Sequence, residues 1–241
     1  MSNDTELLRR MLCVLDISLS PKQSDDFQKY YSELFVWNKK FNLTRILDYS
    51  DVQALHFFDS LTIVRALNSE LLKNGQFLDI GSGAGFPGIP LKIMYPGIKL
   101  TLIEATKKKA AFLNHIVQTL GLELVNVYSE RSEILAHDPS LRSNFDVVLA
   151  RGVAPLRTLV ELTVPFCKVG GLVVVHKGRD AKGEILDASN AIQRLGSKIL
   201  ECIPTNIEQG TPSKCLVVIG KDEPTDGAYP RRVGIPRKRP L

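Results

Sequence analysis

The sequence predicts an α/β protein: a mostly parallel seven-stranded sheet with helices on both faces and an N-terminal helical extension. From residue 77 to residue 203, apolar strand-like runs alternate with helix-like runs, which is typical of a doubly wound parallel sheet. Before residue 76, apolar residues recur at helical spacing. A loop with four glycines directly follows the first strand, at residues 81–88, where such sheets bind ligands.

Residues 1–75 are expected to form the helical extension, packed on the core. Within residues 22–40 and residues 51–67, apolar side chains gather at helical spacing, so each range is predicted to be one amphipathic helix. The pair Asn74-Gly75 closes the extension, because this dipeptide favours a turn.

Residues 76–222 are expected to form the ligand-binding core. Its predicted strands are seven apolar runs: Phe77–Ile80, Leu100–Ile103, Leu124–Val127, Val147–Ala150, Leu172–His176, Lys198–Ile203 and Cys215–Ile219. Its predicted helices separate the first six strands: 88–95, 107–120, 132–136, 155–166 and 181–195. The last connection holds Gly210 and Pro212 and has no helical pattern. We therefore expect a long hairpin with an antiparallel last strand at the edge of the sheet.

Residues 223–241 are predicted to form an extended basic tail, because prolines recur through them. Five of the 31 lysines and arginines lie in residues 229–241, which hold no acidic residue, so 26 basic residues remain for the 26 acidic ones. The whole net charge of +5 therefore belongs to the tail. A basic tail on a neutral body favours a polyanion such as nucleic acid; the alternative is a solvated tail that keeps the protein in solution.

Composition narrows the class and the location of the protein. No apolar run approaches the length of a membrane span. The N-terminal segment is too charged for a signal peptide, so a cytoplasmic protein is expected. The four cysteines are widely spaced and form no CxxC pair, which argues against a metal site or a disulfide framework and favours four buried thiols. No apolar helix face demands a partner, so we expect a monomer.

The glycine loop has two candidate ligands. In one register, Gly83, Gly85 and Gly88 match the dinucleotide fingerprint GxGxxG, and an NAD-dependent oxidoreductase is the corresponding function. In the other, Asp79 precedes the glycines Gly81, Gly83 and Gly85, which matches the first motif of S-adenosylmethionine-dependent methyltransferases. The second register is favoured, because Gly81 directly follows the strand and the Asp79 carboxylate would repel a pyrophosphate.

One further carboxylate supports a nucleoside ligand without separating the two candidates. Glu104 stands at the end of the second predicted strand. In this position a carboxylate can accept hydrogen bonds from both ribose hydroxyls of either cofactor.

Further motifs resemble one family closely. They are residues 37–44 (WNKKFNLT), 56–61 (HFFDSL), 149–154 (LARGVA) and 229–236 (YPRRVGIP). They are similar to signatures of the small-subunit ribosomal RNA guanine-N7 methyltransferases, also called glucose-inhibited division protein B. The resemblance implies a Rossmann-like class I methyltransferase fold, S-adenosylmethionine as the cofactor of the core, and methylation of N7 of a guanine in 16S ribosomal RNA, free or within the small ribosomal subunit.

The resemblance also implies roles for single residues. Gly81 and Phe86 would line the cofactor, Ser132 and Glu133 would flank its adenine, and Arg151 would face the transferred methyl group and position the reactants. The alternatives are a plain core role for Phe86 and an ordinary helix start at Ser132 and Glu133.

The predicted RNA contacts are basic residues near the end of the first long helix and in the tail: Lys39, Lys40, Arg231, Arg232, Arg237, Lys238 and Arg239. A solvated helix face is the alternative for the two lysines. His56 lies in a family motif, and both a core role and a site role remain open for it. No metal is expected.

Absent motifs restrict the chemistry. Enzymes that methylate exocyclic amines usually carry an Asn/Asp-Pro-Pro-aromatic motif after the fourth strand, but this chain has Arg151-Gly152-Val153 there. No cysteine nucleophile stands near this point. Guanine N7 has a free lone pair and no proton to remove, so catalysis would consist of orientation and charge stabilisation. A non-catalytic RNA-binding module, and a methyltransferase for another RNA or a small molecule, remain alternatives.

Overall fold

The computed structural model describes residues 5–178, 180–205 and 214–241. Its centre is one seven-stranded sheet with the order β3-β2-β1-β4-β5-β7-β6. The strands are β1 (Gln76–Ile80), β2 (Lys99–Ile103), β3 (Val125–Tyr128), β4 (Phe145–Arg151), β5 (Cys167–Lys177), β6 (Ser197–Pro204) and β7 (Cys215–Lys221). Strands β1 to β5 pair in parallel, which brings their carboxyl ends to one edge of the sheet.

The antiparallel last strand is confirmed, but its expected position at the sheet edge is wrong. Strand β7 pairs antiparallel with both β5 and β6, so it lies inside the sheet and β6 forms the edge. Burial gives the reason: every residue of β7 is buried, whereas β6 has exposed and half-buried positions along most of its length. A strand that is apolar along most of its length gains most where neighbours cover it on both sides.

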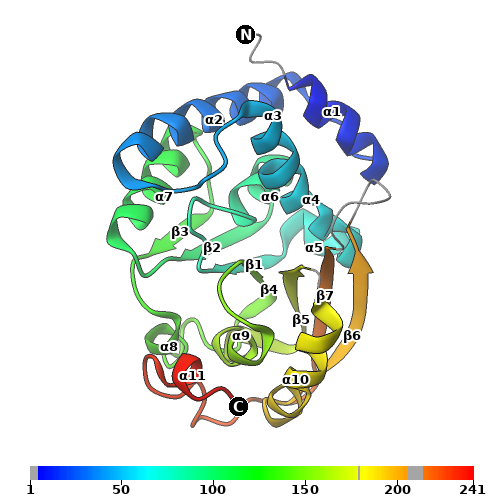
Figure 1. Cartoon of the computed structure of the whole chain (residues 1–241), viewed down its shortest axis with the longest axis vertical. Coiled ribbons are helices and arrows are strands. Elements are labelled where there is room, and N and C mark those ends of the chain that lie inside the picture. Colours follow the sequence, from blue (N-terminus) through cyan, green and yellow to red (C-terminus); the bar gives the residue numbers. More distant parts are fainter. Residues whose placement is uncertain (1–4, 179, 206–213) are drawn as a thin grey trace.

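Helices cover both faces of the sheet (Figure 1). One face carries α1 (Glu6–Leu12), α2 (Pro21–Phe41), α6 (Gly88–Met94) and α7 (Lys107–Thr119), and the other carries α8 (Ser132–Leu135), α9 (Leu156–Thr163), α10 (Ala181–Arg194) and α11 (Ile235–Lys238). Two apolar cores follow from this arrangement, one on each face of the sheet. The N-terminal helices share the first core with α6, α7 and the sheet.

The helical structure expected over residues 51–67 is confirmed, but it is not a uniform α-helix. The chain instead forms α3 (Tyr49–Val52), a π-helical turn (Gln53–Phe58), α4 (Asp59–Leu61) and a 3-10 helix (Thr62–Ala66), and α5 (Ser69–Asn74) follows. Apolar spacing alone does not reveal such a change of helical pitch. Single π-helical turns inside helices are frequent at functional sites, and this one carries His56.

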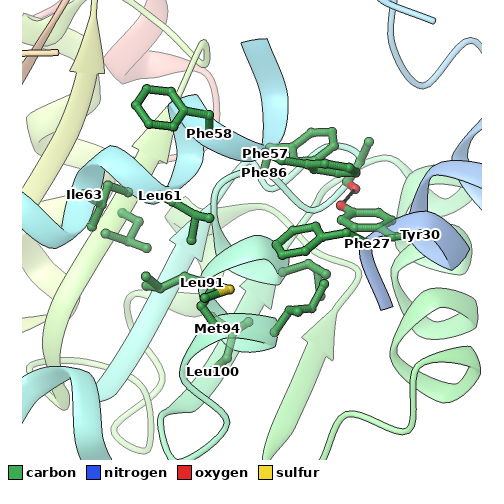
Figure 2. Close-up of a cluster of buried hydrophobic side chains, with 14 of the residues drawn as sticks. Phe27, Tyr30, Phe57, Phe58, Leu61, Ile63, Phe86, Leu91, Met94 and Leu100 are labelled. Atoms are coloured by element: carbon green, nitrogen blue, oxygen red, sulfur yellow. Dashed lines mark hydrogen bonds between the residues drawn. The ribbon is translucent and has the colours of Figure 1, made fainter. Parts of the chain in front are cut away.

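Aromatic packing ties the extension to the glycine loop. The ring of Tyr30 in α2 stacks on Phe86 with centroids 5.4 Å apart, and it also stacks on Phe57 at 5.5 Å. Figure 2 shows these rings together with Phe27 in the buried cluster. The Tyr30 hydroxyl donates a hydrogen bond to the Ala84 carbonyl. Because loops hold their shape through such contacts, the N-terminal helices help to fix the loop that follows β1.

The C-terminal tail differs from the expected extended segment in one place. Pro236 lies in the first turn of the short helix α11, where the missing proline N–H costs no hydrogen bond. The expected burial of all four thiols is also wrong, since Cys13 and Cys202 are exposed while Cys167 and Cys215 are buried. Among the described residues, no helix has the length and hydropathy needed to cross a bilayer.

Candidate active site

The loop after β1 adopts a backbone that only glycine accommodates easily. Gly81, Gly83 and Gly85 have φ values of +67°, +59° and +98°, in the left-handed region that other residues rarely enter. A Cβ on Gly81 would lie 2.7 Å from the side chain of Val153, and one on Gly85 would lie 2.6 Å from the Tyr30 hydroxyl. The predicted glycines therefore serve a tight turn with close packing behind it.

Asp79 is fully buried behind this loop. Its Oδ2 accepts a hydrogen bond of 3.0 Å from the backbone N–H of Gly88, the first residue of α6. Its Oδ1 is buried and has no hydrogen-bond partner among the described residues. Burial raises the pKa of Asp79 to about 7, against the opposing effects of the Gly88 N–H and of Arg151. The carboxyl thus holds the loop and retains one unused acceptor.

Glu104 follows β2 and also supports the loop. Its Oε2 accepts a hydrogen bond of 3.0 Å from the Gly83 N–H, and its Oε1 accepts one of 2.7 Å from the Thr106 N–H. Each carboxylate oxygen has a second lone pair, so the group can still accept bonds from hydroxyls. The side chain lines a cleft of about 600 Å³ at the carboxyl edge of the sheet.

The cleft brings together several of the predicted cofactor residues. Gly81, Glu104, Ser132 and Glu133 line it, with Gly152. Asp79, Gly83, Gly85 and Phe86 are not in its lining and shape it from behind. Arg151, also expected at the cofactor, is not in this lining either and lies in the wall of a neighbouring cavity. The backbone of Gly81 in the lining, the acidic end of β2 and a volume of about 600 Å³ fit S-adenosylmethionine.

Arg151 ends β4 and is held on several sides. Its guanidinium donates to the Leu55 carbonyl at 3.2 Å, to Asp59 Oδ2 at 2.9 Å and to His56 Nδ1 at 3.2 Å. It also lies 5.1 Å from the centre of the Phe86 ring. Arg151 therefore has the carboxylate partner that a buried cation requires. This partner, Asp59, belongs to the N-terminal extension.

A second cavity of about 310 Å³ lies beside the cleft, and both contain Gly152 in their lining. Arg151, His56 and Asp59 line the second cavity together with His176 and Lys214. Asp59 Oδ1 accepts a hydrogen bond of 3.0 Å from the Lys214 ammonium. Sequence reasoning missed Asp59, His176 and Lys214 as site residues; Asp59 stands inside the motif 56–61, which was the one available signal.

The charges of this cavity are fixed by burial and by their neighbours. Burial alone would raise the pKa of Asp59, but His176, Arg151 and Lys214 outweigh it and hold the pKa below its ordinary value. Burial lowers the pKa of His56 and of His176 to about 4 in each case, with Arg151 acting in the same direction. At neutral pH the cavity therefore holds one carboxylate, at least two cations and two neutral imidazoles.

The tautomer of His56 follows from its contacts. The guanidinium of Arg151 can only donate, so His56 Nδ1 must be the acceptor. Nε2 then carries the proton and donates to the Thr44 hydroxyl at 2.8 Å. The ring stacks on Phe86 with centroids 4.4 Å apart. His56 accordingly supports Arg151 from the side of the π-helical turn.

The predicted RNA-binding residues lie in two separate places. Lys39 and Lys40 are exposed in the last turn of α2, and Figure 1 shows α2 and the tail helix α11 at opposite ends of the molecule. Four of the tail cations are exposed: Arg232, Arg237, Lys238 and Arg239. Arg231 differs, because its guanidinium pairs with the fully buried Glu161 at 2.7 Å.

Comparison with known proteins places this geometry in a family. The model of the family "GidB: rRNA small subunit methyltransferase G" matches residues 23–209. Among curated relatives, the ribosomal RNA small subunit methyltransferase G of Dehalococcoides mccartyi (strain CBDB1) is 44% identical over 230 residues, 95% of this chain and 97% of that protein. The protein of the same name from Chloroflexus aggregans is 43% identical over 242 residues, which cover all of both chains.

A solved structure supports the fold independently. A SAM-dependent methyltransferase from Aquifex aeolicus superposes with a TM-score of 0.50 at 18% sequence identity, over 70% of this chain and 92% of that one. This likeness confirms the predicted Rossmann-like class I methyltransferase architecture. Taken with the full-length relatives and the family model, it leads to one conclusion: the chain belongs to the GidB family of rRNA small subunit methyltransferases G.

Proposed function

We propose that this protein transfers a methyl group from S-adenosylmethionine to N7 of a guanine in 16S ribosomal RNA. The observation that carries the proposal is the pair of adjoining cavities that share Gly152, in a chain of the GidB family. The larger cleft has the features of a nucleoside cofactor site. The smaller cavity, with cations and one carboxylate around it, has the size and the polarity for a purine base.

The cofactor residues follow from the cleft. Gly81 lines the cleft with its backbone, and Glu104 offers acceptors for the ribose hydroxyls. Ser132 and Glu133 line the region beyond β3, where the adenine would lie. Asp79, Gly83, Gly85 and Phe86 hold the loop in shape. S-adenosylmethionine supplies an electrophilic methyl group on its sulfonium.

The chemistry requires positioning more than proton transfer. Guanine N7 carries a free lone pair, so no base has to remove a proton. Arg151 is fixed by Asp59 and His56 in the wall of the smaller cavity, next to Gly152, and would contact O6 or a phosphate of the target nucleotide. Methylation of N7 leaves a positive charge on the base, and the Asp59 carboxylate, already paired with Arg151 and Lys214, offsets only part of the positive charge of this cavity. Orientation of N7 toward the methyl group would thus supply most of the rate acceleration.

The RNA itself would be held by exposed cations. Arg232, Arg237, Lys238 and Arg239 extend a positive surface from the tail beside the cleft, and phosphate contacts of this kind make affinity fall steeply with salt. Lys39 and Lys40 lie on a different part of the molecule and would contact a more distant stretch of RNA.

The test is to map the modified nucleotide directly. The purified protein is incubated with S-adenosylmethionine and with unmodified 16S ribosomal RNA or small subunits, and N7-methylguanosine is located by borohydride and aniline cleavage. We expect one new cleavage at a guanine, and no cleavage without the cofactor or with Arg151→Ala. Methyl incorporation without cleavage at a guanine would refute N7 as the target, and binding of NAD in place of S-adenosylmethionine would refute the reaction class.

A further inference from the structure

The basic tail is docked on the protein by a buried ion pair. Glu161 in α9 has no exposed surface, and both of its oxygens accept hydrogen bonds from Arg231. The Arg231 backbone N–H and Nε donate to Oε1 at 2.8 and 2.9 Å, and Nη2 donates to Oε2 at 2.7 Å. Loss of one partner of such a pair leaves a buried charge uncompensated. Arg231 is therefore a structural anchor.

Further contacts fix the chain on either side of this anchor. Before it, His137 donates to the Pro230 carbonyl at 2.9 Å, and Arg142 donates to the Tyr229 carbonyl at 2.8 Å. After it, the Gly234 N–H donates to Glu133 Oε1 at 3.0 Å. The tail thus follows one path across α8 and α9, which lie beside α11 in Figure 1.

This path carries the tail along the cofactor cleft. The cleft lining includes Val233, Gly234, Pro236, Arg237 and Lys238, opposite residues that follow β1, β2 and β4. The tail contacts Glu133 in α8, the helix that follows β3. In this type of sheet the acidic end of β2 binds the ribose, and β3 is the next strand outward. The tail therefore borders the part of the cleft beyond the ribose, where a nucleoside base would lie.

The side chains of the tail suit such a base. Val233 is 48% exposed, although it is apolar and lines a concave site. A flat, largely apolar ring bound there would remove this surface from water. Gly234, with φ of +80°, donates its N–H to Glu133 and so keeps this carboxylate turned toward the tail.

We propose that residues 233–238 form the outer wall of the S-adenosylmethionine site and contact its adenine, so that the tail is a cofactor-binding element as well as an RNA-binding one. This inference rests on the proposed function for the identity of the cofactor. It adds a consequence: cofactor and RNA meet on the same short segment, so any change that one makes to the affinity for the other must be matched by an equal factor in the reverse direction.

The test compares two valines of equal exposure. Val233→Asp places a charge on the proposed wall, and Val169→Asp is the control, because Val169 is 49% exposed and does not line the cleft. Isothermal titration calorimetry with S-adenosylmethionine, without RNA, should show a Kd about tenfold higher for the first variant and within about twofold of wild type for the control. A chain ended after Arg232 keeps the Glu161 anchor and should show at least the same loss.

The outcomes separate this inference from the proposed function. If both Val233→Asp and the shortened chain bind S-adenosylmethionine with wild-type affinity, the wall is refuted, even if both have lost affinity for RNA. If the wild-type protein itself fails to bind S-adenosylmethionine, the proposed function has failed. Thermal unfolding of each variant checks that a lost affinity does not come from an unfolded chain.

Discussion

Replacement of Asp59 by asparagine should impair methyl transfer, although this residue does not line the cofactor cleft. The change removes one negative charge and keeps the size of the side chain. In the wild-type protein, Oδ2 accepts from Arg151 at 2.9 Å and Oδ1 accepts from Lys214 at 3.0 Å. The variant amide can accept only through its single oxygen, so one of the two cations loses its contact with residue 59.

The size of the effect follows from the burial of the three groups. The side chains of Asp59 and Arg151 are 11% and 15% exposed, whereas that of Lys214 is 44% exposed. Breaking a buried pair costs about 3–5 kcal/mol, but Arg151 keeps the Leu55 carbonyl and His56 as acceptors, and water can solvate Lys214. We therefore expect a loss of about 2 kcal/mol in transition-state stabilisation, or about 30-fold in kcat/KM.

The assay measures radiolabel transfer from S-adenosylmethionine to 16S ribosomal RNA under single-turnover conditions. Asp26→Asn is the matched control, since Asp26 in α2 is 15% exposed and also pairs with a lysine, Lys22, but lines neither cavity. The kcat/KM of this variant should stay within about twofold of wild type, because Lys22 is 77% exposed. Cofactor affinity of the Asp59 variant should remain nearly unchanged. Wild-type kcat/KM in Asp59→Asn, or an equal loss in the control, would refute the positioning of Arg151 by Asp59.

Three further measurements check other features. Burial raises the pKa of Asp79 from 3.8 to about 7, so the folded protein favours the protonated carboxyl. The contribution of this group to the free energy of unfolding is complete below about pH 4 and is lost as the pH rises through about 7. Urea unfolding without ligand should therefore show that Asp79→Asn becomes more stable relative to wild type as the pH is raised from about 5 to about 8. The same difference in unfolding free energy at both pH values would contradict this. With its pKa near 4, His56 should show constant imidazole chemical shifts from about pH 6 to 8, whereas a midpoint near 6.5 would disprove its burial as a neutral ring. In thermal unfolding, Gly85→Ala should lower the free energy of unfolding by about 2–4 kcal/mol, because its Cβ would lie 2.6 Å from the Tyr30 hydroxyl. The control Gly121→Ala should cost only about 1 kcal/mol, because Gly121 has a φ of +60° but its Cβ would meet nothing within 4 Å.

The spacing of the apolar residues and the composition of the sequence were enough to predict most of the fold. The runs Phe77–Ile80 and Leu100–Ile103 became β1 and β2 with closely matching bounds, because buried parallel strands are continuous apolar stretches. The position of β7 could not be read in the same way. Strand order depends on which pairings bury most surface across the whole sheet, and an apolar run such as Cys215–Ile219 looks the same at an edge as inside it. The π-helical turn at residues 53–58 could not be predicted for a similar reason, since α- and π-helical turns differ little in the spacing of their apolar residues.

Apart from Ser132, Glu133 and Arg151, which the family resemblance named, the site was predictable mainly where the fold demands a residue type. Gly81 and the acid at Glu104 could be found, since a tight turn and the end of β2 impose them. The role of Arg231 could not, because a tail arginine paired with the buried Glu161 looks the same in the sequence as one that meets phosphate. Asp59 and Lys214 lie 155 positions apart in the chain, so only the folded sheet brings them to one cavity.

The docking of the tail has a consequence for the order in which the protein is made. Translation delivers the glycine loop, Glu104 and α8 long before residues 231–238 leave the ribosome. A growing chain can thus fold its sheet first, yet it has an open cleft until Arg231 reaches Glu161 and Gly234 reaches Glu133. Under the proposed role of residues 233–238, a growing chain would gain full affinity for the cofactor only after this segment has left the ribosome.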